Sequence, residues 1–128
     1  MKIPMWQVDA FATEVFAGNP AAVCLLDGWL GDDVLQAIAA ENNLSETAFL
    51  VRNADGFDLR WFAPAKEVAL CGHATLAAAK VLFDLRGWSA PEIRFLTRQR
   101  GTLTVAKRGE WFEMDFPALP ARPVATPA

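Results

Sequence analysis

The chain has 128 residues, of which 53% are apolar and 21% charged, and a net charge of −3. This composition supplies one folded core and excludes a disordered or low-complexity protein. No run of 18 uncharged apolar residues occurs, and the first residues lack the apolar stretch of a secretion signal. We therefore expect no membrane association and a cytoplasmic location.

Charge is unevenly distributed, with 3 basic and 9 acidic side chains in residues 1–64 and 9 basic and 6 acidic side chains in residues 65–128. Only Phe95 lies among the cations of the second half, whereas a nucleic-acid surface needs several stacking aromatic residues. We expect no nucleic-acid partner. Two cysteines and one histidine do not form the pattern of a disulfide framework or a structural zinc site, so no metal is predicted.

The first half of the chain predicts three strands and one helix. Strands are expected at Ile3–Ala10, Ala21–Asp27 and Thr47–Asn53, because each is rich in apolar residues between turn signals. A helix is expected from Asp32 to about Asn42, with acidic residues in its first turn. Its predicted apolar face consists of Val34, Leu35, Ile38 and Ala39.

The second half predicts a buried helix between strands. Residues 57–61 alternate between apolar and polar, as a half-buried strand does. The segment from about Ala74 to Leu85 is apolar nearly all round, which indicates a helix buried on every side. Three alternating segments around residues 93–95, 103–105 and 112–116 are separated by short glycine-containing breaks, so they should form an antiparallel meander.

These elements predict an α+β fold in which a curved, barrel-like and mostly antiparallel sheet wraps around a central apolar helix. Strands and helices do not alternate regularly, which argues against a doubly wound α/β fold. The proline-rich segment 118–128 lacks periodicity and is interpreted as a linker after a domain at residues 1–117. The chain therefore resembles one domain of a longer protein.

Cys71–Thr75 stands at the start of the predicted buried helix. The backbone N–H groups of Gly72, His73 and Ala74, together with the helix dipole, suit a carboxylate or phosphate group. The alternative is an ordinary helix start, with His73 as a polar cap.

Glu46 is the second candidate, because it directly precedes the apolar residues of a predicted strand. Partial burial there would raise the pKa of its carboxyl group toward the range useful for proton transfer. The alternative is an exposed glutamate at the start of a strand. A third segment, Phe16–Pro20, is by itself a generic turn signal.

Several motifs in this order resemble the PhzF-like family, the phenazine-biosynthesis isomerases of the diaminopimelate epimerase fold. The resemblance extends from Met1 to about Pro120. It rests on Val8–Phe11, Phe16–Val23, Asn43–Phe49, Arg60–Pro64 and Glu67–Leu76.

The resemblance implies two similar domains, each a barrel-like sheet around a helix, with the active site between them. It implies that Glu46 is a general acid/base that moves a proton between carbons of a small carboxylated substrate without a cofactor. In the phenazine pathway that substrate is a dihydro-hydroxyanthranilate. His73 would be a polar partner, the N–H groups of Gly72 and His73 would hold the carboxylate, and Asn19 would lie on the rim.

PhzF-like chains are about twice as long, and their second domain supplies an aspartate and a Gly-Ser loop that have no counterpart here. This chain resembles the N-terminal half. We therefore expect either a missing C-terminal domain as partner or a homodimer that rebuilds the cleft with two copies of Glu46.

Two other functions remain open from the sequence. Cys71 occupies the place of a catalytic cysteine in related racemases and epimerases, so cysteine-dependent racemisation is an alternative, while Cys24 is interpreted as core packing. The other alternative is a catalytically silent half-domain that binds a carboxylate.

Overall fold

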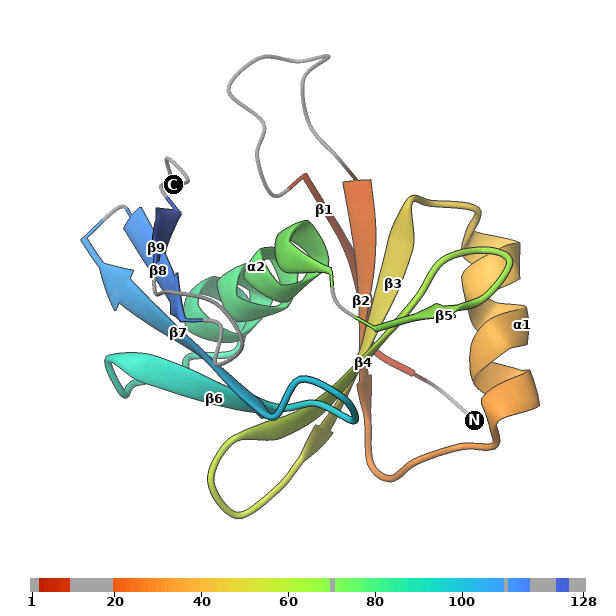
Figure 1. Ribbon diagram of the computed structural model, residues 1–128, viewed down its shortest axis with the longest axis horizontal. Helices are drawn as coiled ribbons and strands as arrows, with labels where there is room; N and C mark the ends of the chain where they lie inside the picture. The colour runs from red at the N-terminus through yellow and green to blue at the C-terminus, as the bar shows by residue number, and fades with distance from the viewer. Residues whose placement is uncertain (1–2, 10–19, 70, 110, 116–121, 125–128) are drawn as a thin grey trace.

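The structure is a computed structural model that describes residues 3–9, 20–69, 71–109, 111–115 and 122–124. These residues form two helices, a π-helical turn and nine strands joined in one sheet, arranged as shown in Figure 1. The strands are β1 (Met5–Asp9), β2 (Pro20–Leu26), β3 (Glu46–Arg52), β4 (Phe57–Phe62), β5 (Glu67–Val68), β6 (Glu92–Leu96), β7 (Thr102–Arg108), β8 (Trp111–Asp115) and β9 (Arg122–Val124).

The strand order is β1-β2-β3-β4-β6-β7-β8-β9, and β5 pairs with β4 beside this path. Six of the eight pairings are antiparallel, including the predicted meander β6-β7-β8. The other two, β2 with β3 and β4 with β6, are parallel. Parallel neighbours need a crossover. Helix α1 (Asp32–Asn42) lies in the first crossover, and helix α2 (Gly72–Lys80) lies in the second.

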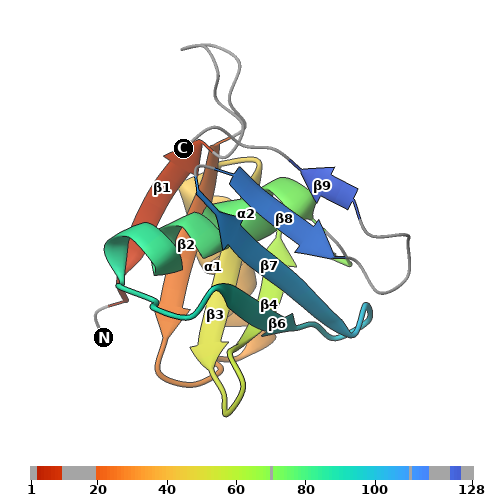
Figure 2. The same ribbon diagram turned by 90° about the vertical axis from the view of Figure 1, so that its left-hand side faces the viewer.

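The two helices cover opposite faces of the sheet. Helix α2 lies inside the curl, between β1–β3 and β7–β9, whereas α1 packs outside (Figures 1 and 2). The larger core gathers around α2, and a smaller core lies beneath α1. Side chains of successive strand residues point to opposite faces, so β2, β3 and β4 contribute to both cores.

The α+β class is confirmed, but closure of the sheet into a barrel is not. Among the described strands, β1 and β9 are the two ends of the strand order and do not pair with each other. The sheet therefore curls around α2 and stays open. Within the predicted linker, Arg122–Val124 form β9 and pair with β8.

Helix α1 has the predicted bounds, but one residue of its predicted apolar face is exposed. Leu35 and Ala39 are buried and Ile38 packs against the smaller core, whereas Val34 is 44% exposed. Residues 35, 38 and 39 share one face of a helix of 3.6 residues per turn, and residue 34 lies at its edge.

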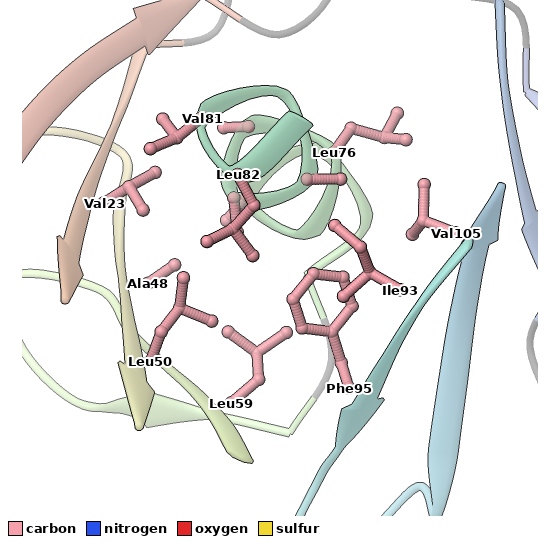
Figure 3. Close-up of a cluster of buried hydrophobic side chains, with 14 of the residues drawn as sticks. Val23, Ala48, Leu50, Leu59, Leu76, Val81, Leu82, Ile93, Phe95 and Val105 are labelled. Atoms are coloured by element: carbon pink, nitrogen blue, oxygen red, sulfur yellow. The ribbon is translucent and has the colours of Figure 1, made fainter. Parts of the chain in front are cut away.

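Helix α2 starts two residues before the predicted position and passes into a π-helical turn, η1 (Val81–Leu85). Its residues from Ala74 to Ala79 are all buried. Alanines let the strands approach closely, while Leu76, Val81 and Leu82 fill the larger spaces around it (Figure 3). In the described part of the chain, neither helix has the length and apolar character needed to cross a bilayer.

Gly56 permits close contact where β4 meets β6. A Cβ atom on this residue would lie 2.1 Å from the carbonyl oxygen of Arg94. Because this oxygen belongs to the backbone and not to a flexible side chain, we expect Gly56→Ala to lower the free energy of unfolding by about 2–3 kcal/mol. Urea unfolding measures this, with Gly28→Ala as control because an added Cβ there meets nothing within 4 Å. Equal stability of the two variants would contradict the prediction.

Candidate active site

The site forms where the start of β3 meets the start of α2. Glu46 is the first residue of β3, and its backbone pairs with Ala21 of the parallel neighbour β2. Cys71 is the N-cap of α2, and His73 is the second residue of that helix. The crossover of α2 over the inner face of the sheet thus brings Glu46 to His73, although 26 residues separate them in the sequence.

The imidazole of His73 lies between a carboxylate and a thiol. Its Nε2 atom is 2.8 Å from Oε2 of Glu46, and its Nδ1 atom is 3.5 Å from Sγ of Cys71. The side chains of His73 and Glu46 are 17% and 20% exposed, so Glu46 is not a fully solvated glutamate at the start of a strand. A carboxylate and an imidazole this close can exchange a proton.

Cys71 is buried, and burial raises the pKa of its thiol to about 12. The nearby Glu46 carboxylate acts in the same direction, whereas the backbone N–H groups of Ala74 and His73 favour the thiolate. Burial dominates, so the side chain is a neutral thiol near pH 7. A neutral thiol is a poor base and a poor nucleophile.

A buried hydrogen-bond chain fixes the start of α2 against β4. The hydroxyl of Thr75 donates to the carbonyl oxygen of Cys71 at 2.7 Å, and Nε1 of Trp61 donates to that hydroxyl at 3.0 Å. Trp61 and Thr75 are both buried. The sequence alone predicts no role for Trp61 beyond its place in an alternating strand. The available signal was an indole N–H on an apolar strand, which needs a partner when buried.

The three residues whose N–H groups are predicted to bind a carboxylate differ in exposure. Gly72 and His73 are partly exposed, whereas Ala74 is fully buried. Gly72 and His73 are therefore the residues of this helix start that a ligand from solvent could reach.

The remaining candidates lie apart from this cluster or outside the described residues. Asn19, expected on the rim, falls outside the described residues. Cys24 is 1% exposed and belongs to the smaller core under α1, as its interpretation as core packing predicted. Asn42 stabilises the turn that precedes Glu46, because its Nδ2 donates a hydrogen bond to Oγ1 of Thr47 at 3.2 Å.

Arg60 is a buried cation for which the sequence predicts no role beyond its place in the Arg60–Pro64 motif. Its guanidinium donates to both carboxylate oxygens of Glu67 at 2.8 Å and to Asp32 at 3.0 Å. These carboxylates raise the pKa of Arg60 above its ordinary value. The network ties β4 to β5 and to α1. It also forms one wall of a pocket of about 430 Å³ that reaches Ala69, two residues before Cys71.

Comparison with known proteins identifies the family. The sequence model of the phenazine biosynthesis-like proteins, PhzC-PhzF, matches residues 8–127. An uncharacterized isomerase of Pseudomonas aeruginosa is 56% identical over 99% of this chain and 49% of its own length. A phenazine biosynthesis-like domain-containing protein of Bos taurus is 46% identical over 96% of this chain and 45% of its own length.

Solved structures agree with the sequence matches. A PhzF-family phenazine biosynthesis protein from Enterococcus faecalis has a TM-score of 0.86 and 50% identity, covering 93% of this chain and 45% of that one. A predicted epimerase from Pseudomonas aeruginosa has a TM-score of 0.70 and 30% identity, covering 89% and 43%. The chain thus spans about half the length of the relatives it matches. On this evidence, the chain belongs to the phenazine biosynthesis-like (PhzC-PhzF) family.

Proposed function

We propose that this chain carries the acid/base half of a cofactor-independent isomerase that acts on a small carboxylated substrate. The observation that supports it most directly is the half-buried Glu46 carboxylate, 2.8 Å from His73 at the start of α2. Relatives of this chain are named isomerases, which supports the same reaction class.

In the proposed reaction Glu46 takes a proton from one carbon of the substrate and a proton is returned to another carbon. The double bond moves between them, so no electrons are gained or lost overall. The carboxylate of the substrate would bind at the N–H groups of Gly72 and His73, where the positive end of α2 favours an anion. His73 would hold Glu46 in place and share its proton.

We further propose that the cleft is completed by another chain segment. The relatives are about twice as long, and proton transfer at carbon needs a site from which water is largely excluded. A C-terminal domain would provide the second wall; two copies of this chain, each with one Glu46, are the alternative. Light scattering measures the solution mass of the chain with and without anthranilate. A dimer that anthranilate stabilises would support the two-copy alternative, and a monomer whose mass anthranilate does not change would contradict it.

The test of the isomerase proposal is hydrogen exchange from solvent. The chain, alone and combined with the remaining half of the 56%-identical Pseudomonas aeruginosa isomerase, is incubated in D₂O with cyclic carboxylates, a dihydro-hydroxyanthranilate among them. We expect deuterium at carbon in the combined protein. Carboxylate binding without any exchange would favour the catalytically silent half-domain instead.

Cysteine-dependent epimerisation is the second candidate, and the position of Cys71 beside His73 is the observation that favours it. The pKa of about 12 disfavours it, because the reaction needs a thiolate. Cys71→Ala separates the two candidates: it should abolish epimerisation and leave a Glu46-dependent exchange in place.

A further inference from the structure

We propose that Glu46, Cys71 and His73 form a binding site for one zinc ion or a chemically similar divalent metal. The three side chains each offer a donor atom, and these atoms all lie within 4.8 Å of one another. Cys71 is buried and the other two are mostly covered, so the site lies inside the protein surface and not on a solvated face. Three protein ligands would leave one position of a tetrahedral ion open for water or a substrate group.

The cysteine and histidine already have a separation suited to a shared metal. Sγ of Cys71 and Nδ1 of His73 are 3.5 Å apart. Zinc bonds to sulfur and nitrogen at tetrahedral angles place these two ligand atoms about 3.6 Å apart. Glu46 now contacts the other ring nitrogen, Nε2. For the third bond, a carboxylate oxygen of Glu46 would have to move from Nε2 toward the sulfur side, and the three donor atoms already lie within 4.8 Å of one another.

The donor set selects the class of metal. A thiolate with an imidazole and one carboxylate oxygen suits zinc, cobalt or cadmium, whereas magnesium and calcium require mainly oxygen donors. Binding would release the Cys71 thiol proton to solvent, because the sulfur coordinates as a thiolate.

Metal binding and proton transfer would compete at this site. A carboxylate held by a metal cannot act freely as a base, so zinc is expected to inhibit any reaction that uses Glu46. This consequence rests on the proposed function, but the binding itself does not. Binding is measured without substrate, so a failure of either proposal leaves the other one testable.

The chain is well suited to a spectroscopic test, because His73 is its one histidine and Cys24 its one other cysteine. The untagged chain is titrated with cobalt(II) alone and then with zinc. We expect one equivalent of cobalt to give the visible bands of a tetrahedral ion and a near-ultraviolet sulfur-to-cobalt charge-transfer band, both removed by zinc.

Matched variants assign the ligands. Cys71→Ala should remove the charge-transfer band, and His73→Gln and Glu46→Gln should each weaken zinc binding about 10-fold or more. Cys24→Ala should bind as the unaltered chain does, because Cys24 lies in the smaller core. Circular dichroism identifies any variant that fails to fold. Absence of the charge-transfer band in the folded, unaltered chain, or its survival in Cys71→Ala, would overturn the proposal.

Discussion

Glu46→Gln is expected to lower the rate of solvent hydrogen exchange into the substrate by about 10²–10⁴-fold. Glutamine has nearly the same shape as glutamate but cannot accept a proton at physiological pH. The side chain is half-buried and lies against His73, so the amide can occupy the same space. Binding of the substrate carboxylate, which we propose takes place at the N–H groups of Gly72 and His73, should change little.

The matched control is Glu41→Gln, which removes an exposed carboxylate from α1 and should leave exchange unchanged. Exchange is followed by proton NMR in D₂O, and binding is followed by calorimetry on the same samples. Full exchange activity in Glu46→Gln would show that another group is the base.

Phe95→Ala is expected to lower the free energy of unfolding by about 3–5 kcal/mol. Phe95 is fully buried, and its ring points from β6 into the core that Leu59 and Leu82 also enter (Figure 3). Removing the ring leaves a cavity that the tightly packed alanines of α2 cannot fill. Since domains of this size are stable by only about 5–15 kcal/mol, the variant should be close to unfolded at moderate temperature.

Leu96→Ala is the matched control for this loss. Leu96 is the next residue of the same strand, but its side chain points to the other face and is 50% exposed. Urea unfolding of both variants should show a large shift of the midpoint for Phe95→Ala and a small one for Leu96→Ala. Equal shifts would mean that strand propensity, and not the core around α2, determines the stability of β6.

Much of the fold could be predicted from the sequence, because its longer elements have either a clear period or a long apolar run. The alternation of apolar and polar residues predicts β4 and the meander, and the apolar character of α2 predicts a helix enclosed by strands. The two-residue strand β5 was missed, since two residues carry no period. The π-helical turn was also missed, because Val81–Leu85 has the same apolar pattern in an α-helix.

The site could be predicted only in part. Local motifs predict Glu46 and His73 as site residues, but their 2.8 Å contact depends on the crossover of α2, which no local pattern encodes. Arg60 was missed for a different reason. It alternates with Leu59 and Trp61, so the pattern predicts a solvated side chain, yet α1 and β5 cover that face of β4.

The junction between β4 and β6 has a consequence for how the molecule opens. Strands β4 and β6 pair through Phe57↔Phe95 and Asp58↔Leu96. Within the described residues, these two residue pairs are the strand pairing that joins β1–β5 to the meander. Apolar packing around α2 also holds these two units together, with a smaller part played by the exposed contacts of Arg98 with Asp32 and Glu67. Their amide protons should therefore exchange with solvent in two groups, and loosening of α2 should separate the groups. A ligand bound where α2 begins would then slow exchange in strands that it does not touch.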